Sequence, residues 1–72
     1  MKFGEDLRKC RKDINLSQKE VAQKLGIYQS SVSDWENDIS RPDYETLFEL
    51  CKMYNVTLYQ LLGIDENTFR KI

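Results

Sequence analysis

The sequence has few of the residues that build irregular loops, metal sites and membrane spans. Its 72 residues include one proline, three glycines and two cysteines, and they contain no histidine. Two cysteines without histidine argue against a zinc site, and they are too few for a disulfide framework. No apolar run approaches the roughly 18 residues that cross a bilayer. These absences favour one small, mostly helical domain, with no membrane segment and no bound metal.

Features of enzymes are missing as well. The chain has no histidine, no plausible nucleophile–base pair and no glycine-rich phosphate loop. We therefore predict a protein that is not an enzyme, with no cofactor and no evident small-molecule ligand. The first residues hold no apolar stretch of signal-peptide length, which predicts a cytoplasmic protein.

The charged residues are distributed unevenly along the chain. Residues 1–25 carry a net charge of +3 and residues 26–72 carry −4, so the net charge of −1 hides an asymmetry. A basic amino-terminal half is suited to phosphates, with the acidic half facing away. A solvated surface of mixed charge is the alternative interpretation.

Apolar spacing places the first and fourth of five expected helices. Phe3, Leu7, Cys10 and Ile14 recur every three or four residues and predict a helix over about 4–13. A similar stripe predicts a helix over about 44–54, capped by Asp43 and ended by Asn55; its residues are Tyr44, Leu47, Leu50, Cys51 and Tyr54. Cys10 and Cys51 both fall in these stripes, so we expect buried free thiols.

Residues 17–36 predict two short helices joined by a tight turn at Gly26. Ser17-x-x-Glu20 is a capping box that starts a helix over about 18–25, and Gly26 ends it in the left-handed region. Ile27 is expected to plug the turn. A third helix over about 29–37 follows, with Val32 and Trp35 facing inward.

A second capping box starts the fifth helix. Thr57-x-x-Gln60 has the same spacing as the first box, and the helix is expected to continue through Leu62 until Gly63 closes it.

The order of these features carries a family resemblance. The matching residues are Leu7, Arg11, Leu16, Ser17, Gln18, Glu20, Ala22, Leu25, Gly26, Val32, Trp35, Glu36, Asn37, Arg41, Pro42, Leu47, Leu58, Leu61, Leu62 and Gly63. Together they resemble the phage-repressor and Cro-like (Xre-type) helix-turn-helix family over about residues 3–63. The resemblance implies an all-α, compact five-helix, lambda-repressor-like DNA-binding domain over residues 1–63. Residues 64–72 would form a short tail, and its apolar Ile64, Phe69 and Ile72 could belong to a dimer contact.

The resemblance also implies roles for individual residues. The base-reading positions of the third helix are Gln29, Ser30, Ser33 and Asp34, of which Ser33 is the weaker candidate. The phosphate-contacting positions are Gln18, Tyr28, Asn37 and Arg41. Arg11 and Glu36 match a partly buried ion pair. Against these roles stands the interpretation that the polar residues are only the solvent face of a surface helix.

Two departures from the family pattern matter. Tyr28 stands where the family commonly has Ser or Thr, and tyrosine cannot cap the helix amides, although its hydroxyl could bond a phosphate. The third helix also has no Lys or Arg. Its Asp34 would have a role if it accepted a hydrogen bond from a cytosine amino group.

The function that follows is a sequence-specific, repressor-like transcriptional regulator. It would bind a double-stranded DNA operator as a homodimer, with the third helix in the major groove. The alternative is a protein-interaction module, such as an antitoxin or the partner of another regulator, for which DNA binding is secondary.

Overall fold

The computed structural model describes residues 3–62, which form five helices and no strands. They are α1 (Phe3–Asp13), α2 (Gln18–Leu25), α3 (Gln29–Glu36), α4 (Tyr44–Tyr54) and α5 (Leu58–Leu62). The predicted all-α, five-helix fold is confirmed, and every predicted helix end lies within one residue of the observed one. The predicted roles of Gly63 and of the tail at residues 64–72 lie outside the described residues.

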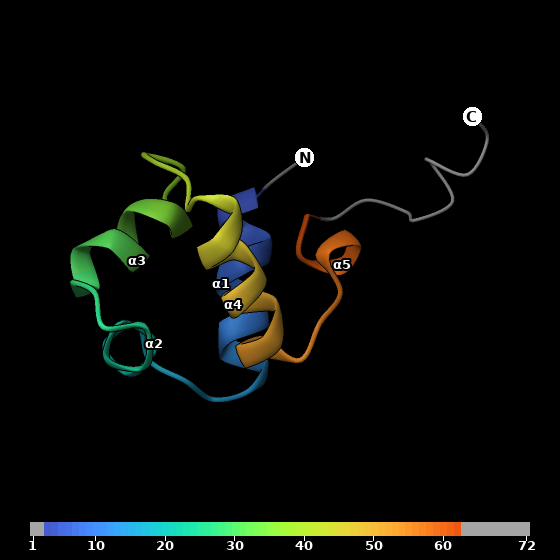
Figure 1. Cartoon of the computed structure of the whole chain (residues 1–72), viewed down its shortest axis with the longest axis horizontal. Coiled ribbons are helices and arrows are strands. Elements are labelled where there is room, and N and C mark those ends of the chain that lie inside the picture. Colours follow the sequence, from blue (N-terminus) through green and yellow to red (C-terminus); the bar gives the residue numbers. More distant parts are fainter. Residues whose placement is uncertain (1–2, 63–72) are drawn as a thin grey trace.

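The helices are arranged around α1. Helices α2 and α3 pack on each other, and both α3 and α5 pack against α1. In Figure 1, α2 and α3 lie on one side of α1 and α5 lies on the other. The pair α2 and α3 and the helix α5 are therefore on opposite sides of the bundle (Figure 1).

Both predicted capping boxes are present. The Ser17 hydroxyl accepts a hydrogen bond from the Glu20 amide at 3.0 Å, and the Glu20 carboxylate accepts one from the Ser17 amide at 2.9 Å. Thr57 and Gln60 make the same reciprocal pair at 3.1 and 2.8 Å. Each box satisfies amides that a helix start leaves without an internal partner.

Left-handed residues end α2 and α4, as predicted. Gly26 has a φ of 69° and Asn55 has a φ of 55°. The amide of Gly26 donates to the carbonyls of Ala22 and Gln23, which closes the last turn of α2. Asp43 caps α4 by accepting a hydrogen bond from the Thr46 amide at 2.8 Å.

The core lies between the five helices. Its buried apolar residues are Phe3, Leu7, Val21, Ala22, Val32, Trp35, Leu50, Cys51, Tyr54 and Leu61. Cys51 is buried as expected, whereas Cys10 is only half-buried at the edge of this core.

Three residues expected to point inward are exposed. Ile14 lies just past the end of α1, where Asn15 takes a left-handed conformation, so the helical spacing no longer directs its side chain. Tyr44 is the first residue of α4 and is 71% exposed, because it extends past the core at the helix start. Ile27 is 36% exposed, and it closes the turn through its amide, which donates to the Ala22 carbonyl at 3.0 Å.

The amino end of α1 is in close contact with the loop that follows α3. A Cβ atom placed on Gly4 would lie 2.5 Å from the carbonyl oxygen of Glu36, so only glycine fits at this position. The amide of Gly4 donates to the Asp38 carboxylate at 3.0 Å. In the same loop, the Arg41 guanidinium lies 4.7 Å from the centroid of the Phe3 ring, within the range of a cation–π contact.

Candidate nucleic-acid interface

Helix α3 has a buried side and an exposed side. Val32, Trp35 and Glu36 are buried against the rest of the domain. Gln29 and Ser30 are exposed, and Ser33 and Asp34 are half-buried. The four predicted base-reading residues therefore avoid the core, and one short helix brings them together. This geometry fits both a reading helix and a plain solvent-facing helix.

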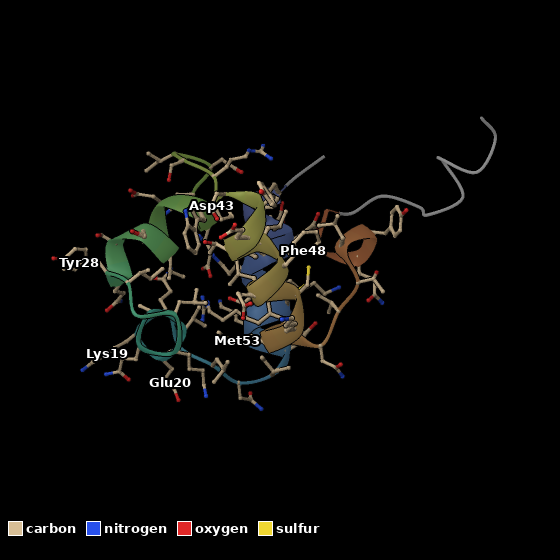
Figure 2. The ribbon with its side chains drawn as sticks, viewed as in Figure 1. Lys19, Glu20, Tyr28, Asp43, Phe48 and Met53 are labelled. Carbon is tan, nitrogen blue, oxygen red and sulfur yellow. The ribbon has the colours of Figure 1, made fainter. Side chains whose placement is uncertain are left out.

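The amino end of α3 has no side-chain cap. Tyr28 occupies the cap position without a side-chain hydrogen bond to the helix, as its chemistry predicted. Its side chain is 83% exposed, and Figure 2 shows it projecting outward from the start of α3. The hydroxyl is thus accessible to a phosphate, and the uncapped amides can favour an anion nearby.

Glu36, the last residue of α3, is the centre of a buried polar cluster. Arg11 binds it in a bidentate manner, from Nε to Oε2 at 2.7 Å and from Nη2 to Oε1 at 2.9 Å. Gln18 donates to Oε1 at 3.0 Å, and Arg8 Nε lies 3.4 Å from the same oxygen. Helices α1 and α2 are thereby both joined to the end of α3. The predicted ion pair between Arg11 and Glu36 is confirmed.

The cluster keeps Glu36 ionised. Burial by itself would raise the pKa of the Glu36 carboxyl, but the hydrogen bonds from Arg11 and Gln18 bring that pKa below its ordinary value. The hydrogen bond to Glu36 raises the pKa of the Arg11 guanidinium. Arg11 also donates to the Leu16 carbonyl at 2.8 Å, which fixes the connection between α1 and α2.

The other three predicted phosphate residues, Gln18, Asn37 and Arg41, contact other residues of the domain. Gln18 is half-buried and donates to Glu36. Asn37 is exposed; its amide nitrogen donates to the Ser33 carbonyl at 2.9 Å, and its oxygen accepts from Arg8 at 3.1 Å. Arg41 is also exposed but lies on Phe3, in the loop between α3 and α4. Gln18 and Asn37 thus meet the same cluster, and Arg41 contacts a different part of the domain.

Arg8 belongs to this cluster and was missed by the sequence analysis. It bridges Glu36 and Asn37, and its side chain is 40% exposed. A signal was available, because Arg8 and Arg11 are three residues apart and so share one face of α1.

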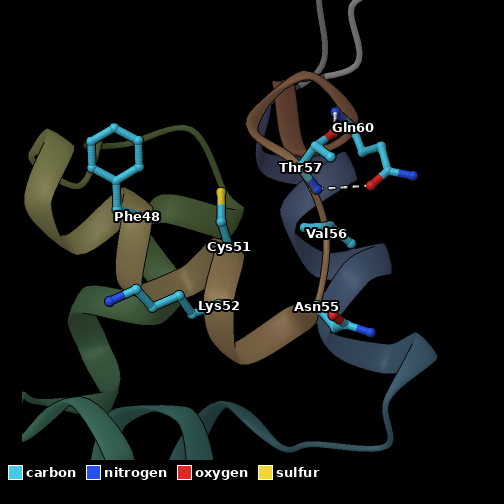
Figure 3. Close-up of a pocket in the computed structure, with 7 residues that line it drawn as sticks. All are labelled: Phe48, Cys51, Lys52, Asn55, Val56, Thr57 and Gln60. Atoms are coloured by element: carbon cyan, nitrogen blue, oxygen red, sulfur yellow. Dashed lines mark hydrogen bonds between the residues drawn. The ribbon is translucent and has the colours of Figure 1, made fainter.

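A concave surface lies between α4 and α5, apart from the exposed side of α3. Figure 3 shows this open groove, of about 630 Å³, with Phe48, Cys51 and Lys52 from α4, Asn55 to Thr57 from the connection, and Gln60 from α5. Phe48 is 50% exposed and meets the Tyr44 ring edge to face, with the ring centroids 6.4 Å apart. Burial raises the pKa of the Cys51 thiol, which makes it a poor nucleophile.

Residues 3–62 lack two features of other functional classes. They contain no group of three or more side chains able to hold a metal ion. They also contain no helix long and apolar enough to cross a membrane.

Comparisons with known proteins identify the family. The model of a family described as "Helix-turn-helix" matches residues 7–61. The chain is 41% identical over 66 residues to the HTH-type transcriptional regulator ImmR of Bacillus subtilis, covering 92% of this chain and 52% of ImmR. It is 38% identical to the uncharacterized HTH-type transcriptional regulator YqaE of the same species, covering 90% and 56%. It is also 32% identical to the antitoxin PezA of Streptococcus pneumoniae, covering 89% and 40%.

The chain spans about half the length of ImmR and YqaE. The family match, by contrast, covers most of the chain and includes α2, the turn at Gly26 and α3. Together with the exposed polar side of α3, this match shows that the chain belongs to the helix-turn-helix family.

Proposed function

We propose that this protein is a sequence-specific transcriptional regulator that binds double-stranded DNA with α3 in the major groove of an operator. The observation that carries the proposal is the two-sided packing of α3. Its buried residues hold the helix in one position, while Gln29 and Ser30 extend into solvent from its first turn. Small helix-turn-helix domains read base edges with residues near the amino end of this helix.

The proposed contacts divide into two classes. Gln29, Ser30, Ser33 and Asp34 would read base edges, and Gln29 suits adenine, whose N6 and N7 together match a glutamine amide. Asp34 would accept from a cytosine amino group. The phosphate contacts would come from Gln18, Tyr28, Asn37 and Arg41, which position the protein without reading sequence.

The test is the variant Gln29→Ala, assayed on two DNA duplexes. One carries a site selected from a random library, and the other has random sequence. We expect a loss of about 1–3 kcal/mol on the selected site, because a bidentate base contact is removed. Binding to random DNA should stay nearly unchanged, because phosphate contacts supply it. Gln23→Ala is the matched control, since Gln23 is an exposed glutamine on α2. Equal losses on both duplexes would contradict the base-reading role.

We further propose that the regulator acts in the cytoplasm as a homodimer on an inverted repeat. Proteins that read the major groove in this way place their half-sites about one helical turn apart, roughly 34 Å. The exposed Tyr44 and Phe48 offer apolar surface beyond what the core uses, which supports self-association. Sedimentation of the protein alone and with a two-half-site duplex would measure the number of protomers in each state. A single protomer on such a duplex would contradict the dimer.

A protein-binding role is the second candidate. Two observations favour it: the absence of Lys and Arg from α3, and the relationship to a protein named as an antitoxin. This candidate predicts weak binding to both duplexes and a tight complex with a protein partner. Titrating the parent chain with the same two duplexes therefore separates the two functions. Only a sequence-specific DNA-binding protein binds the selected duplex more tightly than the random one.

A further inference from the structure

The reading helix lacks the positive charge that phosphate binding needs. Helix α3 contains Asp34 and Glu36 but no Lys or Arg. Most of the affinity of a protein for DNA comes from cations that neutralise phosphates and release counterions. Arg41, the one cation among the phosphate contacts proposed above, lies on Phe3 in the loop after α3. If α3 enters the groove, another element has to bring a cation to the DNA backbone beside the carboxyl end of α3.

Arg8 of α1 is fixed next to the carboxyl end of α3. Its Nη2 donates to Asn37 Oδ1 at 3.1 Å, and its Nε lies 3.4 Å from Glu36 Oε1. These contacts hold the guanidinium in place, although the side chain is 40% exposed. A guanidinium has further N–H groups, so Arg8 can donate to another oxygen without releasing Asn37.

The charge of Arg8 is not cancelled within the cluster. Glu36 already receives two hydrogen bonds from Arg11, and both of these side chains are buried. The buried pair is neutral as a unit. Arg8 is therefore the charge of the cluster that remains in excess, and it is also the one that reaches solvent.

The amide of Asn37 is already engaged. Arginine only donates hydrogen bonds, so the side-chain oxygen of Asn37 must face Arg8 and its nitrogen must face the other way. That nitrogen donates to the Ser33 carbonyl at 2.9 Å and lies 3.3 Å from the Ser33 hydroxyl. The donor left over at this point of the surface is Arg8 rather than Asn37.

We propose that Arg8 binds a backbone phosphate of the DNA directly, next to Asn37, and supplies the cation that α3 lacks. The inference rests on the proposed function, since it names a further residue of the same interface. Asn37 then acts mainly by positioning Arg8. A charged residue of α1 becomes part of a surface otherwise assigned to α2, α3 and the loop after α3.

The test is the salt dependence of binding to a labelled random-sequence duplex of about 20 base pairs. The affinities of the parent chain and of Arg8→Gln are compared between about 50 and about 200 mM salt. The logarithm of the binding constant falls linearly with the logarithm of the salt concentration. Removing one phosphate contact should make this negative slope shallower by about 0.9 per protomer. Affinity at the lower salt concentration should fall on the order of tenfold, as for one lost charge-assisted hydrogen bond. Arg8→Lys keeps the charge and should keep most of the slope.

Lys9→Gln is the matched control, because Lys9 is the neighbouring, exposed cation of α1. A slope that falls as much for Lys9→Gln as for Arg8→Gln would mean a general field effect and would overturn the contact. The contact would also be overturned if Arg8→Lys lost as much of the slope as Arg8→Gln, because a positive charge at this position would then not be what binds the phosphate. Thermal unfolding of each variant would serve as the check that the fold is retained.

Failure of the proposed function would look different. A parent chain without affinity for the selected or the random duplex would overturn DNA binding itself. Normal binding with an unchanged slope in Arg8→Gln would overturn only the phosphate contact of Arg8.

Discussion

The two ends of the bundle are held together by different kinds of contact. Around α3, the apolar contacts of Val32 and Trp35 are joined by a buried charge, Glu36, which receives hydrogen bonds from Arg11 and Gln18. Around α5, the tie is apolar, since Leu61 is fully buried and α5 packs against α1 and α4. Both ends bury apolar surface, but only the α3 end adds directional bonds to a buried charge.

This difference matches the demands on each end. Hydrogen bonds to an ionised group need correct distances and angles, so the cluster at Glu36 fixes the orientation of α3 relative to α1 and α2. Apolar packing is non-directional, so α5 contributes stability without aiming a particular side chain. The end expected to meet DNA is thus the one with the stricter geometry.

The largest effect is expected from Glu36→Ala. Removing one partner of a buried ion pair leaves Arg11 without its carboxylate, which costs about 3–5 kcal/mol. Chemical denaturation would measure the loss of unfolding free energy. Glu36→Gln is the control, because it keeps the shape and an acceptor oxygen and should be less harmful. If Glu36→Ala proved as stable as the parent chain, the cluster would have no structural role.

Leu61→Ala should destabilise the protein somewhat less, by about 3 kcal/mol, through lost apolar contact and a cavity. It should leave DNA affinity close to the parent value well below the melting temperature, because α5 is not joined to Glu36. Denaturation and duplex titration on the same sample would show this. Leu58→Ala, at a half-buried position of the same helix, should cost less. If Leu61→Ala lost much of its DNA affinity while still fully folded, the α5 end would also be needed to orient α3.

Lowering the pH should weaken the α3 end through Glu36 and leave the apolar contacts of α5 unchanged. The loss of unfolding free energy should be smaller than in the two variants above. The pKa of Glu36 is lowered in the folded state, so its stabilising contribution is present above the unfolded pKa and is lost as the pH falls through the folded pKa. Unfolding free energy should therefore decline below about pH 4.5, the ordinary pKa of a glutamate carboxyl. The decline should be shallower in Glu36→Gln. Parallel curves for the two proteins would assign the acid sensitivity to the exposed caps Glu20 and Asp43, whose pKa values are also lowered by hydrogen bonds.

The smallest effect is expected from Tyr54→Phe. The Tyr54 hydroxyl is buried and has no hydrogen-bond partner within the described part of the chain. Burial and the nearby Glu36 carboxylate raise its pKa. Replacing an unpartnered polar group by hydrogen should be neutral, or stabilising by up to about 1 kcal/mol. Thermal unfolding would measure the change in stability. A clear loss of stability in Tyr54→Phe would contradict the prediction and would mean that the hydroxyl has a hydrogen-bond partner in solution.

Local patterns in the sequence were sufficient for most of the fold. The capping boxes at Ser17 and Thr57 and the left-handed residues Gly26 and Asn55 each act over a few residues, so they can be read directly. Ile14 and Tyr44 were misplaced because they lie at helix ends, where periodicity stops describing the direction of a side chain.

Contacts between distant residues were harder to foresee. Gly4 looks like an ordinary glycine inside a helical pattern, and its need to be glycine comes from the backbone of Glu36. The pair of Arg11 and Glu36 was found through family resemblance, whereas Arg8 and the bond from Gln18 to Glu36 depend on side-chain geometry. The base contacts proposed for Gln29 and Asp34 would depend on the DNA sequence, which lies outside the protein.

The exposed first turn of α3 has a consequence for how such a protein can evolve. Gln29 and Ser30 lie outside the core, whereas Val32, Trp35 and Glu36 hold the same helix in place. Substitutions at the two exposed positions should therefore carry little folding penalty, since surface changes usually alter stability by less than about 0.5 kcal/mol. Descendants of one ancestral gene can drift to new binding preferences by changing these positions while the scaffold stays under purifying selection.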